Sequence, residues 1–132
     1  MSEFAEKLRS RTKSFAIDII KYGQKLPKNE EAFVIKKQLF KSATSVAANY
    51  RAVCRGRSDA EFYSKLCIVV EEADETVFWL EMIQDSGINK GEENTKLQKE
   101  ANELLAIFSS SKKTMNARYN KKGKLNPKTQ KS

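Results

Sequence analysis

The residues of this 132-residue chain whose types and spacing could do chemistry are its cations, and that chemistry is the binding of anions. Five of them fall on or directly after one face of a predicted helix: Lys37, Lys41, Arg51, Arg55 and Arg57. Side chains of this kind bind nucleic-acid phosphates, and such contacts position a nucleic acid without reading its sequence. The alternative interpretation is a solvated surface whose charges partly pair with acids elsewhere in the chain.

The sequence offers little for catalysis. It has no histidine, which removes the commonest general base and the commonest metal ligand. Its five glycines are isolated and form no phosphate-binding loop. Cys54 and Cys67 lie on different predicted helices and have no histidine that could activate a thiolate. We therefore expect a protein that is not an enzyme and that has no catalytic residues, no cofactor and no metal.

One acid-rich cluster, Glu71, Glu72, Asp74 and Glu75, could in principle hold a metal ion. A dimetal bundle would need Glu-x-x-His pairs on separate helices, and the chain has none. The cluster follows the basic predicted helix after a tight turn, so the two helices run antiparallel and Lys41 lies roughly opposite Asp74. We expect acids and bases to pair across this junction, each exposed pair contributing about 0–1 kcal/mol.

Charge is unevenly distributed along a chain of net charge +8. Residues 26–57 hold seven cations and two acids, residues 58–89 hold one cation and eight acids, and residues 118–132 hold six cations and no acid. We predict one domain over 1–117 and a flexible basic tail over 118–132. Its candidate phosphate contacts are Arg118, Lys121, Lys122, Lys124, Lys128 and Lys131. Tails of this composition also occur as solubilising ends.

Four amphipathic segments would position these residues, with apolar side chains recurring at intervals of three and four. They cover about 3–25, 30–55, Asp59 to the stop at Ser86-Gly87, and Asn89 or Gly91 to about 117. Asn29 is a predicted N-cap, and Ser58 with Glu61 forms a capping box. The sequence predicts an all-α protein, an antiparallel up-and-down four-helix bundle.

The third predicted helix is apolar on more than one face. A helix of this kind is central in its bundle or is also buried against another chain. The candidate residues for an interface between copies are Tyr63, Val70, Phe78 and Trp79.

No stretch reaches the run of about 20 apolar residues that spans a bilayer, and the first residues lack the apolar core of a signal peptide. Two cysteines make no disulfide framework. We expect a cytoplasmic protein with free thiols and no membrane association.

A longer motif runs from Gln38 to Leu80. Its best-defined parts are Ser45-Val-Ala-Ala-Asn49-Tyr-Arg-Ala52, Arg55-Gly-Arg57-Ser58, Glu71-Glu-Ala-Asp-Glu75 and Phe78-Trp79-Leu80. The chain resembles, over about 3–117, the four-helix-bundle proteins encoded in intervening sequences of bacterial 23S rRNA genes. That family includes the accessory variability determinant of diversity-generating retroelements. Much of the family reads Asn-Ile-Ala-Glu-Gly where this chain has Asn49-Tyr-Arg-Ala-Val53, so no role of that glutamate carries over.

The resemblance implies a homopentameric barrel, and the retroelement member binds nucleic acid and a reverse transcriptase through basic surfaces. Our hypothesis is a non-enzymatic, oligomeric nucleic-acid-binding accessory protein for RNA or DNA, with a reverse transcriptase as a further partner. Its contacts would come from Arg51, Arg55, Arg57 and the tail lysines. The alternative is a protein–protein interaction scaffold with no nucleic-acid role, whose basic charge serves solubility.

Overall fold

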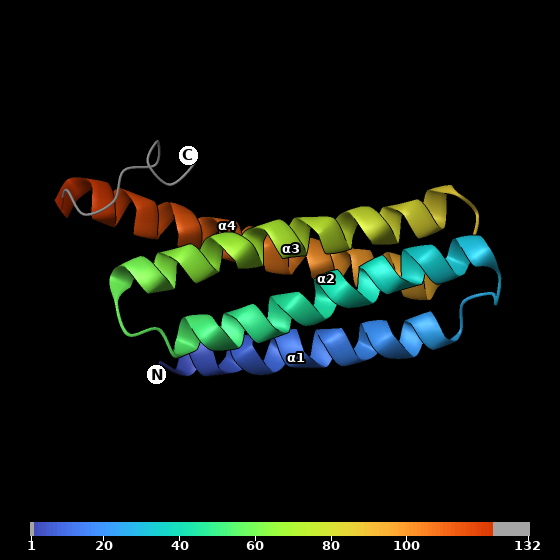
Figure 1. Cartoon of the computed structure of the whole chain (residues 1–132), viewed down its shortest axis with the longest axis horizontal. Helices are drawn as coiled ribbons and strands as arrows, with labels where there is room; N and C mark the ends of the chain where they lie inside the picture. The colour runs from blue at the N-terminus through green and yellow to red at the C-terminus, as the bar shows by residue number, and fades with distance from the viewer. Residues whose placement is uncertain (1, 123–132) are drawn as a thin grey trace.

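A computed structural model of the chain describes residues 2–122, which form four α-helices and no strand (Figure 1). The helices are α1 (Glu3–Gln24), α2 (Glu30–Cys54), α3 (Asp59–Asp85) and α4 (Glu92–Lys122). They run alternately in opposite directions, since each connection is too short for a crossover. This confirms the predicted antiparallel four-helix bundle. The chain start, the α2–α3 turn and the end of α4 therefore lie at the same end of the molecule (Figure 1).

Local capping explains where the helices begin and end. The side chain of Asn29 accepts a hydrogen bond from the Ala32 N–H at 2.9 Å, and that of Ser58 accepts one from the Glu61 N–H at 3.1 Å. Each satisfies an amide that has no partner within its own helix. After α3, Gly87 adopts a φ of +83°, a conformation that side chains with a Cβ rarely tolerate. These predicted helix boundaries are confirmed to within one residue.

The fourth helix is longer than predicted. We expected its end near residue 117, but α4 continues to Lys122. The extra turn contains neither glycine nor proline, and Gly123 is the first residue with weak helix propensity that follows it. Arg118, Lys121 and Lys122 are thus helical rather than part of a flexible tail. The candidate contacts Lys124, Lys128 and Lys131 lie outside the described residues.

Large apolar side chains from all four helices meet in one core. Ile19 of α1, Leu39 of α2, Leu80 of α3 and Phe108 of α4 are each fully buried. α3 contacts both α2 and α4, just as α2 contacts both α1 and α3, so the contacts within the bundle do not single out α3 as its central helix.

The core also holds a polar side chain that the sequence pattern did not reveal. Asn94 is fully buried, and its Nδ2 donates to the Tyr22 hydroxyl at 2.8 Å and to the Leu80 carbonyl at 3.1 Å. Its Oδ1 accepts from Gln98 Nε2 at 2.6 Å. Because every donor and acceptor must be satisfied at once, this group fixes how α1, α3 and α4 meet.

Candidate nucleic-acid interface

Arg51, Arg55 and Arg57 stand at the end of α2 and in the turn that follows it. All three side chains are exposed. Among residues 2–122, none of them has a carboxylate within 4.0 Å. The sequence left open whether these arginines are exposed or paired with acids of the third helix, and the structure places them in solvent.

The ion pairs of the described residues lie elsewhere. Arg11 of α1 binds both carboxylate oxygens of Glu100 of α4, at 2.6 and 2.7 Å, and lies 3.4 Å from Glu103. Lys25 pairs with Glu93 at 3.1 Å, again joining α1 to α4. These contacts hold the first and last helices together, where the sequence predicted pairing between the second and third.

The predicted pairing between α2 bases and α3 acids is wrong within this part of the chain. The contact between these helices includes one buried polar pair, in which Thr76 Oγ1 donates to Ser42 Oγ at 2.9 Å. Lys41 and Asp74 are both exposed, because equal height along a bundle does not make two side chains point toward each other. Burial and the neighbouring Glu75 raise the pKa of Glu72, and Lys41 opposes that shift through space without a direct contact.

A groove between α1 and α2 begins at Arg51 and has a volume of about 560 Å³. Its lining residues are Arg9, Ser10, Lys13, Ala16, Ile17, Ile20, Thr44, Ala47, Ala48 and Arg51. We call it the α1–α2 groove. Three of these residues are cations, and most of the others have small side chains, so a second helix could approach closely. The sequence pattern placed Arg9 and Lys13 in α1 but could not show that they face Arg51.

A second basic region lies at the end of the bundle where the chain starts (Figure 1). Arg55 and Arg57 reach it from the α2–α3 turn, and Arg118 reaches it from the last part of α4, which extends past the start of α3 (Figure 1). We call these three exposed residues the basic end. Acids share this end in the first turns of two helices, Glu3 and Glu6 in α1 and Asp59 and Glu61 in α3, where the helix dipole favours them. Lys121 and Lys122 belong to the final turn of α4.

The four candidate interface residues on α3 differ in how deeply they are buried. Tyr63 is only 3% exposed and belongs to the core, so it cannot pack against a second copy, and we withdraw it from the predicted interface. Val70 and Trp79 are half-buried. Phe78 is 48% exposed and meets the Trp79 ring edge-on at 4.8 Å between centroids. Periodicity had placed Tyr63 on a second apolar stripe without showing that the folded bundle buries that position.

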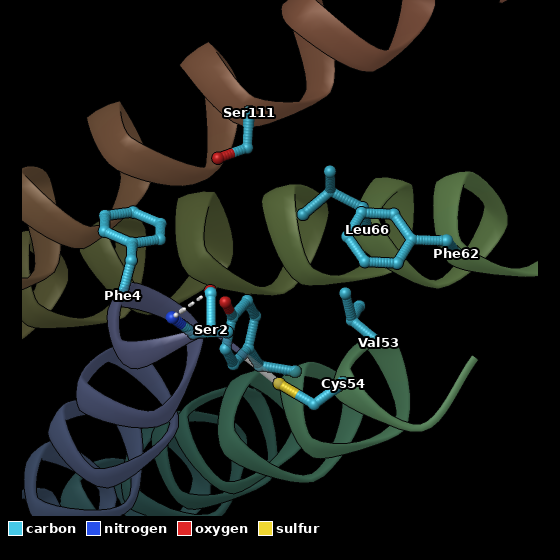
Figure 2. A pocket seen from close by; sticks show the side chains of 9 residues that line it. Ser2, Phe4, Val53, Cys54, Phe62, Leu66 and Ser111 are labelled. Atoms are coloured by element: carbon cyan, nitrogen blue, oxygen red, sulfur yellow. Dashed lines mark hydrogen bonds between the residues drawn. The ribbon is translucent and has the colours of Figure 1, made fainter. Parts of the chain in front are cut away.

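An apolar pocket of about 270 Å³ opens at the same end of the bundle as the basic end (Figure 2). Its lining includes the apolar side chains of Phe4, Val53, Phe62 and Leu66, together with the Cys54 thiol. Burial raises the pKa of the Cys54 thiol, although the Tyr50 hydroxyl and nearby cations oppose the shift. A protonated thiol without a general base is a poor nucleophile, so this geometry does not favour nucleophilic catalysis by Cys54.

Cys54 should therefore react slowly with iodoacetamide in the folded protein. In a Cys67→Ser variant at pH 8, we expect alkylation slower than that of a small free thiol, because less of the buried group is thiolate. The raised pKa also means that the folded state favours the neutral form, so the rate should climb only at more alkaline pH. Urea should bring the rate to that of the free thiol, and equal rates with and without urea would contradict the assignment.

Residues 2–122 contain no group of three or more Cys, Asp or Glu side chains that could hold a metal ion. Within the same range, no helix is both long enough and apolar enough to cross a membrane.

Comparison with known proteins agrees with this architecture. The family model of the 23S rRNA-intervening sequence proteins matches residues 7–110. A crystal structure of a protein of unknown function from the S23 ribosomal protein family of Bacteroides thetaiotaomicron superposes with a TM-score of 0.74. The two chains are 29% identical over 80% of this chain and 98% of that one. No curated protein matches the chain.

Proposed function

The chain belongs to the 23S rRNA-intervening sequence protein family, and we propose that it is a non-enzymatic, oligomeric nucleic-acid-binding protein. The observation that carries the proposal is the exposure of Arg51, Arg55 and Arg57 without an acidic partner among residues 2–122. An arginine held in an ion pair must lose it before it binds phosphate, whereas these three are available. The family name refers to 23S rRNA, so structured RNA is the first ligand to test.

The geometry suits contacts to a phosphate backbone. Arg51 and Arg55 are one helical turn apart, about 6 Å along the axis, and Arg57 continues the series into the turn. The guanidinium group can bind phosphate through two parallel hydrogen bonds. Arginine contacts to phosphates carry no sequence information, so the binding we propose depends on charge rather than on sequence.

Assembly would multiply this charge. We propose a homopentamer, as the family resemblance implies, in which the basic ends of all copies lie on one side of a ring. Arg55, Arg57 and Arg118 would then recur around one axis. Weak contacts made by several linked copies add to a much higher overall affinity than one copy provides.

Filter binding of labelled structured RNA and of duplex DNA at low salt tests the proposal. We expect the wild type to retain both. A variant with Arg55, Arg57 and Arg118 replaced by glutamine should bind at least about tenfold more weakly, since these side chains can no longer neutralise phosphates. Removing residues 123–132, with three further lysines, should weaken binding as well.

A matched control has the same change of charge at the opposite end of the bundle. Lys21, Lys28 and Lys90 are exposed near the α1–α2 and α3–α4 connections, and their replacement by glutamine should leave retention nearly unchanged. Equal weakening by both triple variants would mean that only net charge matters. Failure of the wild type to retain either nucleic acid would reject the proposal.

A protein-interaction scaffold is the second candidate, favoured by exposed apolar side chains on α3. Phe78 is 48% exposed and Met82 is 37% exposed. A partner protein, such as the reverse transcriptase that the resemblance implies, would then dock on this helix.

A further inference from the structure

The solvent-facing side of α3 carries a regular stripe of acidic and then apolar side chains. Glu71, Glu75, Phe78 and Met82 follow one another at intervals of four, three and four residues, and all are exposed. This spacing keeps a row on one side of a helix, as in helices that pack against a partner. We call these four residues the α3 stripe. Within residues 2–122, no other helix covers them.

The α1–α2 groove has the complementary order of charge and apolar surface. Arg9 and Lys13 come first along α1, with Arg51 facing them from α2. Ile17, which is 43% exposed, and Ile20 follow farther along α1. The groove thus presents cations and then isoleucines, where the stripe presents acids and then Phe78 and Met82.

In the groove and in the stripe, the charged pair and the apolar pair are separated by the same distance along the helix. The centre of the pair Arg9 and Lys13 lies about 11 Å from that of the isoleucine pair, at 1.5 Å per helical residue. On α3, the centre of the glutamate pair lies about 11 Å from the centre of Phe78 and Met82 by the same measure. One placement of a helix in the groove therefore satisfies the charged and the apolar contacts together.

We propose that the α3 stripe of one copy packs into the α1–α2 groove of a second copy. Small side chains such as Ala16, Thr44 and Ala48 along the groove let the incoming helix approach closely. The contact covers Phe78, Met82 and Ile17, which are three of the large apolar side chains that a single copy exposes. The inference rests on the oligomeric part of the proposed function and names the surfaces that form the oligomer.

The direction of the patterns determines the symmetry. Acids precede apolar residues along α3, and cations precede apolar residues along α1, so the incoming α3 runs parallel to α1. Within one bundle α3 is already parallel to α1, because the helices alternate in direction. Neighbouring bundles therefore point the same way. Since two different surfaces meet, the contact is heterologous, so its repetition gives a ring or an open filament rather than a two-fold dimer, and the pentamer proposed above requires the ring.

This arrangement gives the arginines separate roles. In the assembled protein Arg51 contacts the acids of the neighbouring copy and no longer belongs to the phosphate contacts, whereas the basic end, with Arg55, Arg57 and Arg118, remains free. Parallel bundles place every basic end on the same side of the ring. The side that binds nucleic acid is then a consequence of how the copies pack.

Charge reversal tests the contact by light scattering of nucleic-acid-free protein. Two variants each reverse one surface: Glu71→Lys with Glu75→Lys, and Lys13→Glu with Arg51→Glu. Each should raise the protein concentration of half-assembly by about tenfold or more, since like charges then face each other. Carrying all four substitutions in one chain restores opposite charges across the contact, so that chain should assemble again.

Glu81→Lys with Glu92→Lys is the matched control, because both residues are exposed and lie off the stripe. It should assemble like the wild type, and circular dichroism should show that every variant keeps its helices. Any of three results would overturn the inference. The wild type could be a monomer of 15.1 kDa, both charge-reversed variants could assemble like the wild type, or the four-substitution chain could fold but stay monomeric. The variant lacking the basic-end arginines should form an oligomer of the wild-type size. Loss of RNA binding can therefore be distinguished from loss of the contact between copies.

Discussion

Leu80→Ala is expected to lower the free energy of unfolding by about 2–5 kcal/mol. Leu80 is fully buried in α3, the helix that packs against both α2 and α4. The substitution removes apolar packing and leaves a cavity that helices on either side cannot close without disturbing one another. Its carbonyl also accepts the hydrogen bond from Asn94, so any shift of the α3 backbone disturbs the buried polar group. Urea unfolding followed by circular dichroism measures the change.

Two further residues of the same helix make the comparison specific. Leu66→Ala should lower the stability to a similar extent, because Leu66 is 1% exposed. Glu81→Ala, at an exposed position, should change the stability by no more than about 0.5 kcal/mol. All variants need the same protein concentration, because assembly adds to the apparent stability. Equal effects of Leu80→Ala and Glu81→Ala would contradict the burial of Leu80 between α3 and its neighbours.

The helices could be predicted from the sequence because the signals that define them are local. Asn29 and Ser58 each accept a hydrogen bond from an amide three residues away. Gly87 adopts a positive φ, which depends only on its own lack of a Cβ. No comparable signal stands at residue 117. The change to a basic composition there resembled the start of a disordered tail, yet lysine and arginine favour helix, and α4 continues to Lys122.

For the candidate site, the sequence predicted which residues share a face of each helix, but not how the faces of different helices combine. Periodicity shows which residues share a face of one helix, but not which neighbouring helix that face meets. The cations of α1 illustrate this, because Arg11 binds Glu100 of α4 whereas Arg9 and Lys13 line the α1–α2 groove. The same limitation placed Tyr63 on an interface although the folded bundle buries it, and it left the buried Asn94 unrecognised.

Binding of structured RNA is expected to weaken steeply as salt rises, because each phosphate that the protein neutralises releases counterions. Two copies that each contribute Arg55, Arg57 and Arg118 would neutralise about six phosphates, and the affinity should then fall on the order of 10³-fold between 50 and 200 mM salt. The slope of the logarithm of the binding constant against the logarithm of salt concentration measures how many phosphates are neutralised.

Three variants show which side chains contribute to that slope. Replacing the three basic-end arginines with glutamine should flatten it by about 0.7–0.9 for each phosphate that is no longer neutralised, whereas replacing Lys21, Lys28 and Lys90 should leave it unchanged. Removing residues 123–132 should flatten it if Lys124, Lys128 and Lys131 bind phosphate too. Light scattering at each salt concentration is needed, because the proposed contact between copies is also charged. If RNA is retained with a slope near zero while the oligomer stays intact, interactions other than those with phosphate hold it, and the exposed apolar side chains of α3 become the surface to mutate.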